Sequence, residues 1–259
     1  MLPRINTESI ETYLLSVLDG SRRGRVAFLL RGLLQFLSWI FTVLVQFRIW
    51  LYRHRILRGN TLGCQVISVG NLTVGGTGKT PVVEVFARNL QQQGRKVAIL
   101  SRGYKSRSIP FWQKIWLRIN NRSIEVPPRV VSDGKQLLLD SHTAGDEPYM
   151  LASNLPDVAV VVDKDRVKSG KYAIRVLGCD ALILDDGFQY LRVGNRLDIA
   201  LVDRTNPYGG GHLLPRGLLR EPMKNIKRAG FIFITKCDEQ GAPELKNQLR
   251  EMNPTAEIS

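Results

Sequence analysis

Residues 66–81 read VISVGNLTVGGTGKTP and place an apolar run, a glycine-rich loop and the start of a helical stretch in direct succession. A helix that begins at Lys79 would direct its free N–H groups and the positive end of its dipole at an anion. The Lys79 ammonium would pair with phosphate oxygens, and the Thr80 hydroxyl would bind Mg²⁺. The stretch therefore predicts a nucleotide-phosphate loop that consists of Thr73, Val74, Gly75, Gly76, Thr77, Gly78, Lys79 and Thr80.

The loop departs at one position from the usual GxxxxGK[ST] pattern, because Thr73 stands where the first glycine is expected. We expect Gly75 and Gly76 to supply the backbone freedom instead, since a residue without Cβ lets a phosphate approach the chain. A chance match to a glycine turn is the alternative, and the strand-like and helical flanks of the loop disfavour it.

Short apolar runs alternate with helical stretches after Gln65, at residues 66–69, 97–100, 158–162, 181–184, 199–202 and 231–235. Several runs are continuously apolar, which is typical of strands buried on both faces of a parallel sheet. The alternation predicts an α/β domain over residues 61–259, with a doubly wound, mostly parallel sheet like that of P-loop NTPases. Residues 105–130 are expected to form an inserted loop or hairpin.

The composition is strongly basic: 37 Lys and Arg face 23 Asp and Glu, a formal charge of +14 over 259 residues. Such a charge suits an anionic partner, either nucleic acid, acidic lipid or a phosphorylated substrate. The arginines cluster around an apolar segment rather than along an aromatic-bearing groove, so no nucleic acid is expected. Cys64, Cys179 and Cys237 show no CxxC or zinc spacing and are expected to be reduced thiols.

The N-terminal region, residues 1–60, contains the most apolar stretch of the chain at 26–51, which carries no charge from Gly32 to Phe47 and is bracketed by arginines. A helix that spans a bilayer needs about 20 apolar residues, and the uncharged stretch from Gly32 to Phe47 is shorter than that. We therefore expect a helix that lies in, or partly enters, the bilayer interface, with arginines on lipid phosphates. The alternatives are a helix docked on the protein's own core and a fully spanning helix.

Two carboxylates end the apolar run ALILDD at 181–186. A carboxylate at the carboxyl edge of a parallel sheet, beside a phosphate loop, is typical of a residue that meets Mg²⁺. Asp185 and Asp186 are therefore candidate catalytic residues, and Asp185 is also a candidate metal ligand. An aspartate that merely ends a strand is the alternative.

Another acidic pair, Asp146 and Glu147, lies in GDEPYM at 145–150, just before a helical stretch. One of them could accept a hydroxyl proton while the other helps to hold the metal. The alternative is a helix N-cap with an acidic first turn, which Pro148 would suit.

A third segment, TKCD at 235–238, weakly resembles the base-reading box of GTPases, and we favour an ordinary strand end there.

Five motifs in order resemble one family: GNLTVGGTGKTP, SRGY at 101–104, GDEP, DDGFQ at 185–189 and LLREP at 218–222. They are similar to those of the tetraacyldisaccharide 4′-kinases of lipid A (lipopolysaccharide) biosynthesis. The resemblance implies Mg²⁺-dependent transfer of the γ-phosphate of ATP to the 4′-hydroxyl of an acylated glucosamine disaccharide 1-phosphate, which gives lipid IV-A. It further implies a peripheral or monotopic enzyme on the cytoplasmic face of a bacterial inner membrane, with the N-terminal helix on anionic lipid.

The resemblance also assigns roles to single residues. It implies that Asp146 is the general base and that Lys79, Asp185 and Asp186 complete the catalytic set. Thr80, Glu147 and Asp185 would bind the metal ion. Polar residues on the substrate side would be Arg102, Tyr104, Arg166, Gln189, Arg220 and Glu221.

The sequence departs from the family pattern in three places. Tyr190 follows DDGFQ where the family usually has histidine, and Arg216 intrudes before LLREP. Nothing after Asp238 resembles the late histidine motif of the family, so we expect that its C-terminal part is missing here. The alternatives to a competent kinase are a truncated or inactive kinase-like protein and a membrane-anchored P-loop NTPase switch.

Overall fold

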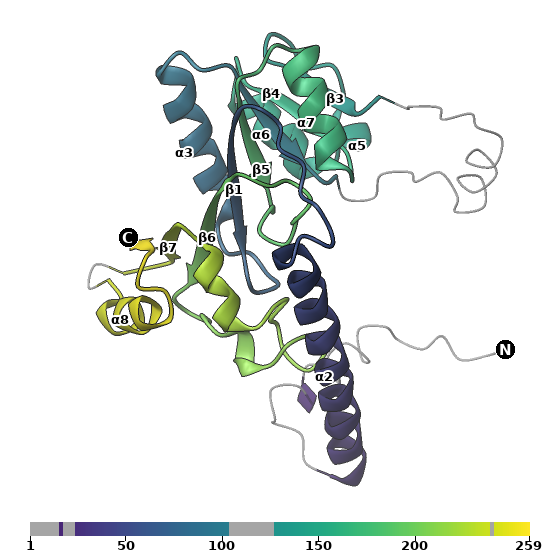
Figure 1. Cartoon of the computed structure of the whole chain (residues 1–259), viewed down its shortest axis with the longest axis vertical. Helices are drawn as coiled ribbons and strands as arrows, with labels where there is room; N and C mark the ends of the chain where they lie inside the picture. Colours follow the sequence, from purple (N-terminus) through teal and green to yellow (C-terminus); the bar gives the residue numbers. More distant parts are fainter. Residues whose placement is uncertain (1–15, 18–23, 104–126, 239–240) are drawn as a thin grey trace, which may run out of the picture. The chain divides into compact units, whose positions relative to one another are not determined.

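The computed structural model describes residues 16–17, 24–103, 127–238 and 241–259. These residues form two compact units (Figure 1). The central unit comprises Arg58–Gly70 and Gly78–Ile199, and the terminal unit comprises the residues up to Leu57, Asn71–Thr77 and Ala200–Ser259. Most of the expected insertion at 105–130 lies outside the described residues.

The central unit is built on five strands in the order β3-β4-β2-β5-β1. Four of them pair in parallel, and β3 pairs antiparallel to β4 at the edge. The sheet that the alternating apolar runs predict is thereby confirmed, with an antiparallel edge strand added. The strands are β1 (Gln65–Asn71), β2 (Val97–Ser101), β3 (Arg129–Asp133), β4 (Ala159–Val162) and β5 (Ala181–Asp185).

The helices of the central unit cover both faces of its sheet. α3 (Lys79–Gln92) connects β1 to β2, and α7 (Arg166–Arg175) connects β4 to β5 in the opposite direction along the sheet. Since crossovers between parallel strands are right-handed as a rule, connections that run in opposite directions place the two helices on opposite faces, which is the doubly wound arrangement. α5 (Ser141–Ala144) and α6 (Asp146–Asn154) precede β4, and α6 packs near α3. The apolar strand residues are buried between these layers.

The terminal unit carries the strands β6 (Leu197–Asp203, from Ala200 onward), β7 (Phe231–Thr235) and β8 (Glu257–Ile258), in that order. The turns η1 (Gly209–Gly211) and η2 (Met223–Arg228) separate β6 from β7, and α8 (Pro243–Met252) precedes β8. Asn253, which ends α8, donates hydrogen bonds from Nδ2 to the carbonyls of Ile226 and Ala229 at 2.9 Å each. This buried amide fastens α8 to the turn η2.

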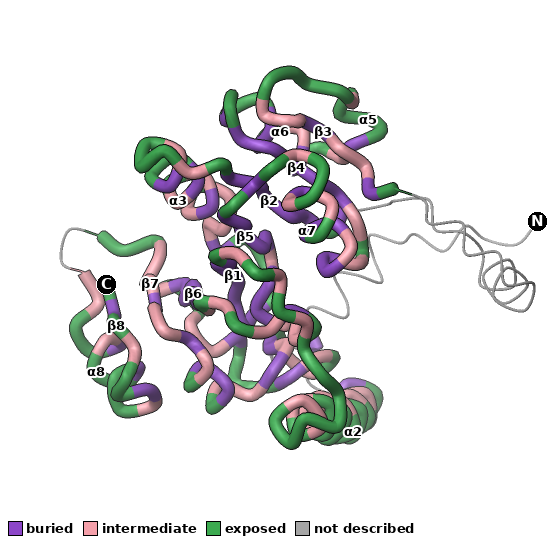
Figure 2. The backbone as a smooth tube through the Cα atoms, turned by 45° about the horizontal axis from the view of Figure 1, so that its top comes forward, coloured by how far each residue is buried: buried purple, intermediate pink, exposed green. Residues whose placement is uncertain are grey.

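The apolar stretch near the N-terminus forms one continuous helix, α2 (Arg25–Arg53), of 29 residues. Its buried residues are Ala27 and Ser38, and Figure 2 shows exposed and intermediate residues alternating along it. This low burial disfavours the alternative of a helix docked on the protein's own core, although one face of the helix contacts the chain through Ser38 and Gln46. Its length and composition would allow it to cross a bilayer.

Candidate active site

The centre of the site is the carboxyl end of β5, beside that of β2. Strands that run in parallel bring their carboxyl ends to one edge of the sheet, where ligands bind in open α/β folds. At that edge the Ser101 hydroxyl donates a hydrogen bond to Oδ2 of Asp185 at 3.1 Å. Asp185 is only 4% exposed, and its Oδ1 has no hydrogen-bond partner in the part of the chain that the structure describes.

Burial dominates the electrostatics of Asp185. Burial, followed by the nearby carboxylates of Glu147 and Asp186, raises the pKa of Asp185 to about 6, against the partial compensation of Ser101 and Lys79. A cation stabilises a buried carboxylate that has acidic neighbours and an oxygen without a hydrogen-bond partner. The surroundings of Asp185 therefore suit the binding of a cation.

The start of α3 faces this edge as the sequence predicts. Gly78 is the N-cap residue at φ 74°, a left-handed conformation that a side chain would strain, and no side chain caps the helix. The Lys79 ammonium lies 3.7 Å from Oδ1 of Asp186. The Thr80 hydroxyl donates to Oε1 of Glu147 at 2.9 Å. Three sequence motifs thus meet at one place in the central unit.

Asp146 is the first residue of α6, and it is exposed. The N-cap residue that precedes its helix is Gly145, which supplies no side-chain hydrogen bond. The capping alternative is therefore wrong for Asp146 itself, although the acidic first turn is present. Within the described ranges, its carboxylate makes no hydrogen bond or ion pair, so both oxygens are available to a ligand.

The residues predicted to hold Mg²⁺ fit that ion. Thr80, Glu147 and Asp185 offer only oxygen donors, and Oδ1 of the buried Asp185 has no hydrogen-bond partner in the described part of the chain. No group of three His, Cys, Asp or Glu residues that could hold a metal alone exists among the described residues. Mg²⁺ characteristically uses one or two carboxylates together with substrate phosphates and water, so such a group is not required.

The predicted substrate-side residues of the central unit differ in exposure. Arg102 is exposed and Gln189 is half-buried. Arg166 is 4% exposed, and its Nη2 donates to the carbonyl of Asp185 at 3.2 Å, which places the guanidinium behind the strand end. This position suits support of Asp185 better than contact with a substrate. Tyr104 lies outside the described residues.

The glycine-rich part of the loop belongs to the terminal unit, where it pairs with the LLREP segment. The N–H of Val74 donates to the carbonyl of Leu218, and that of Arg220 donates to Leu72, at 2.7 Å each. Val74, Gly75 and Gly76 are exposed, while Thr73 and Thr77 are buried. The loop backbone that a phosphate would approach is therefore open.

Glu221 accepts hydrogen bonds on its carboxylate from residues of its own unit. It is 3% exposed and accepts hydrogen bonds from both terminal nitrogens of Arg228, at 2.8 and 3.1 Å, and from Nδ2 of Asn225 at 2.9 Å. Arg220, its neighbour, is half-buried. The carboxylate of Glu221 thus holds the LLREP segment in shape, while its expected role towards a substrate stays a prediction.

The segment 235–238 has its polar groups engaged internally. The Thr235 hydroxyl donates to the carbonyl of Thr77 at 3.0 Å, Lys236 pairs with Asp203, and Arg204 pairs with Asp238. To read a nucleotide base, the Asp238 carboxylate would have to break its ion pair with Arg204. The segment therefore fits an ordinary strand end better than a base-reading box.

Sequence reasoning quoted SRGY but gave no role to Ser101. No local pattern marks this role, because Ser101 lies beside Asp185 only through the pairing of β2 with β5.

The comparisons with known proteins agree with this geometry. The LpxK family model, described as tetraacyldisaccharide-1-P 4'-kinase, matches residues 30–258. The tetraacyldisaccharide 4'-kinase of Pelobacter propionicus is 40% identical over 229 residues, 88% of this chain and 59% of that protein. The corresponding protein of Geobacter sulfurreducens is 39% identical over 231 residues, 89% of this chain and 61% of that protein. The chain thus spans about three-fifths of the length of these relatives.

A solved structure is similar as well. The "apo" form of LpxK from Aquifex aeolicus, in complex with ATP, superposes with a TM-score of 0.68 at 38% identity. The match covers 80% of this chain and 59% of that one. Since the family model matches well over half of the chain and the motif residues converge at one sheet edge, the chain belongs to the tetraacyldisaccharide-1-P 4'-kinase (LpxK) family.

Proposed function

We propose that this protein transfers the γ-phosphate of ATP to the 4′-hydroxyl of a tetraacyldisaccharide 1-phosphate, which gives lipid IV-A in lipid A biosynthesis. The observation that carries the proposal is the convergence of Lys79, the Thr80–Glu147 pair and the orphaned Asp185 at one sheet edge. Family membership supplies the acceptor, and the ATP complex of the Aquifex aeolicus relative supports the donor.

In this proposal the residues of the phosphate loop, Thr73 to Thr80, bind the nucleotide. Its open backbone and the uncapped start of α3 offer N–H groups to the β- and γ-phosphates, and Lys79 adds a cation. Thr80, Glu147 and Asp185 would hold Mg²⁺, which supplies charge neutralisation on the phosphates when bound. Lys79 shifts from Asp186 towards the phosphates, since the ion pair at 3.7 Å is long.

Asp146 acts as the base. Its exposed carboxylate has no partner in the part of the chain that the structure describes and can accept the proton of the acceptor hydroxyl. Phosphoryl transfer needs mainly positioning and electrostatic stabilisation, so one well-placed proton acceptor beside fixed cations suffices. Arg102 and Gln189 are proposed to contact the acceptor.

We further propose that α2 places the enzyme on anionic lipid at the cytoplasmic face of the inner membrane, as a peripheral or monotopic protein. The polar groups of the helix face the protein: the Ser38 hydroxyl donates to the carbonyl of Leu213 at 2.9 Å, and Gln46 donates to Asn225 at 3.3 Å. The apolar side chains point outward instead. A helix with this inverted polarity suits a hydrocarbon environment, and its flanking arginines suit lipid phosphates.

The direct test combines the purified chain, Mg·ATP and a tetraacyldisaccharide 1-phosphate in mixed micelles. We expect phosphorylation of the acceptor and, in a separate titration, Mg·ATP binding. Because the chain spans only part of its relatives' length, the two readouts are informative separately. Binding without transfer would support the alternative of an inactive kinase-like protein. Nucleotide hydrolysis that ignores the acceptor would support an NTPase switch, and absence of binding would overturn the proposal.

A further inference from the structure

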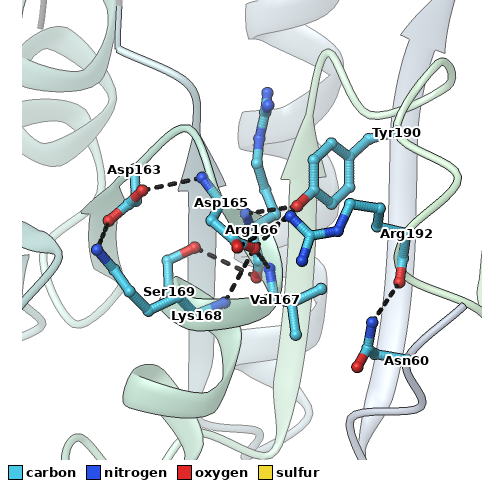
Figure 3. Close-up of polar contacts among 9 residues, drawn as sticks. All are labelled: Asn60, Asp163, Asp165, Arg166, Val167, Lys168, Ser169, Tyr190 and Arg192. Carbon is cyan, nitrogen blue, oxygen red and sulfur yellow. Dashed lines mark hydrogen bonds and ion pairs between the residues drawn. The ribbon is translucent and has the colours of Figure 1, made fainter. Parts of the chain in front are cut away.

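The side chain of Tyr190 contacts both ends of Arg166 (Figure 3). Its hydroxyl accepts a hydrogen bond from the backbone N–H of Arg166 at 3.0 Å and donates one to Oδ1 of Asp165 at 3.0 Å. Its ring lies against the guanidinium, with Cζ of Arg166 5.1 Å from the ring centroid. That distance is within the range of a cation–π interaction. One tyrosine therefore fixes the backbone and the charge of the same arginine.

Asp165 also holds the start of α7, where it is the N-cap residue before Arg166. Its Oδ1 caps α7 by accepting from the N–H groups of Val167 and Lys168, and its Oδ2 accepts from Arg192 at 2.9 Å. Burial opposes ionisation, but the hydrogen bonds from Tyr190 and Arg192 hold the pKa of Asp165 below its usual value. The first N–H groups of α7 are thus satisfied by Asp165 and Tyr190, and the helix start cannot move independently of Tyr190.

Arg166 is a buried cation with little direct hydrogen bonding. Nη2 reaches the carbonyl of Asp185, but the buried Nε has no hydrogen-bond partner within the described ranges. Burial lowers the pKa of Arg166, and the charges of Asp185 and Asp186 counteract this. Burying a charge that is incompletely hydrogen-bonded is costly, so the aromatic face of Tyr190 supplies compensation that the backbone does not.

Tyr190 is itself anchored independently of Arg166. Arg196 donates to the carbonyl of Phe188 at 3.3 Å and also to that of Tyr190, and its Nε pairs with Asp198 at 3.0 Å. The backbone that carries the Tyr190 ring is therefore held by contacts that do not involve Arg166.

We propose that Tyr190 is a positioning residue: it clamps Arg166 against the Asp185 carbonyl and so keeps the Asp185–Asp186 turn in the shape that binds Mg·ATP. This inference rests on the proposed function, in which that turn meets the nucleotide. The Tyr190 side chain would act on Asp185 through Arg166, whose backbone and guanidinium it contacts.

Three variants of the full chain separate the parts of the clamp. Tyr190→Phe keeps the ring and removes the hydroxyl, whereas Tyr190→Leu removes both and keeps apolar bulk. Arg166→Met removes the guanidinium and leaves Tyr190 in place. Tyr172→Phe is the matched control, because Tyr172 lies on the same helix and its hydroxyl makes no hydrogen bond among the described residues.

The readouts are amide hydrogen exchange, measured without nucleotide over residues 164–168 and 185–189, and the affinity for Mg·ATP. Tyr190→Phe should speed exchange only over 164–168 and leave the affinity unchanged. Tyr190→Leu and Arg166→Met should speed exchange over 185–189 as well. They should weaken Mg·ATP binding by about 10- to 100-fold, the usual effect of losing a group that orients a metal ligand.

Several outcomes would overturn the clamp. One is parent-like exchange over 185–189 in both Tyr190→Leu and Arg166→Met. Another is a lower unfolding temperature with parent-like Mg·ATP affinity of the folded protein, which would indicate a merely structural role. If Tyr190→Leu does not fold, Arg166→Met decides alone. Failure of the unmodified chain to bind Mg·ATP would instead refute the proposed function, and the exchange data would still report on the clamp.

Discussion

At Asp146 the structure leaves an exposed carboxylate at the first position of α6, with Gly145 as the cap. Asp146→Asn keeps the shape of the side chain and removes the proton acceptor. We expect phosphoryl transfer to fall by roughly 10²- to 10⁴-fold, because the acceptor hydroxyl loses its base. Mg·ATP affinity should be unchanged, since the phosphate loop is untouched. Steady-state phosphorylation of the acceptor and a parallel nucleotide titration measure the two effects.

The matched control for this change is Asp157→Asn. Asp157 is also exposed in the central unit, and its left-handed backbone (φ 70°) tolerates asparagine. Equal and substantial transfer rates in Asp146→Asn, Asp157→Asn and the parent would rule out Asp146 as the base.

Asp185 gives a prediction about stability and pH. Its pKa rises from the model-compound value of 3.8 to about 6 on folding, so ionisation is harder in the folded protein. The resulting destabilisation is absent below about pH 4, grows between pH 4 and 6, and is complete above pH 6. With metal removed by a chelator, Asp185→Asn should raise the free energy of unfolding by about 1–3 kcal/mol at pH 7.5.

The gain in free energy of unfolding of Asp185→Asn over the parent should vanish towards pH 4. Urea unfolding of both proteins at several pH values measures this difference. A gain that is the same at pH 4 and pH 7.5 would contradict the assigned cause. The gain should also come with loss of Mg·ATP binding, because the substitution removes a proposed metal ligand.

Which site residues the sequence can predict depends on whether their contacts are local in the chain. Lys79, Thr80 and Glu147 could be found because each sits in a local motif whose backbone shape is fixed by its neighbours. The Ser101–Asp185 hydrogen bond and the burial of Arg166 depend on which strands are adjacent. Strand order is a long-range property, so residue spacing could not predict either of them.

At the scale of elements, the exposed apolar side chains of α2 (Arg25–Arg53) allow the proposed membrane contact to be tested. Leu29, Phe36 and Val43 are 70%, 55% and 66% exposed. Each such side chain would contribute about 1.5–3 kcal/mol when buried in hydrocarbon. Replacing all three by serine should therefore weaken binding to phosphatidylglycerol vesicles by at least about 100-fold. Vesicle co-sedimentation over a range of lipid concentrations measures this.

The control replaces Val85 and Val176 by serine, which are 56% and 61% exposed but lie on the central unit. Vesicle affinity should not change there. If the triple variant of α2 still binds vesicles as tightly as the parent, the helix does not supply the lipid contact.

The elements that the sequence predicts well are long or continuously apolar. The runs at β1, β2, β4, β5, β6 and β7 were expected within a residue or two of their observed bounds. β3 and β8 were missed for physical reasons. β3 is a half-buried antiparallel edge strand, and β8 has two residues, so neither carries a continuous apolar run.

At the scale of the whole molecule, the chain interleaves its two units. Residues 71–77 belong with the C-terminal segment, while the residues on either side of them belong to the central unit. Composition along the chain cannot reveal this, because it depends on contacts between distant segments. The expected boundary near residue 60 remains a prediction.

Nucleotide binding should appear as a property of the whole molecule, because a ligand that binds only the folded state raises its stability. At 100 times the dissociation constant the gain is about 2.7 kcal/mol, which for a chain of this size corresponds to roughly 5–11 °C in unfolding temperature. We expect that increase with Mg·ATP, a smaller one with ATP and a chelator, and almost none for Lys79→Ala. Differential scanning fluorimetry measures all of these.

Lys135→Ala is the matched control, since Lys135 is an exposed lysine of the same unit with no place in the proposed site. It should keep the full increase. An equal increase in Lys79→Ala would show that ATP binds elsewhere on this basic protein, through its net charge of +14 rather than through the loop. Repeating the measurement at high salt separates the two, because screening removes attraction between exposed charges but spares contacts in a closed phosphate site.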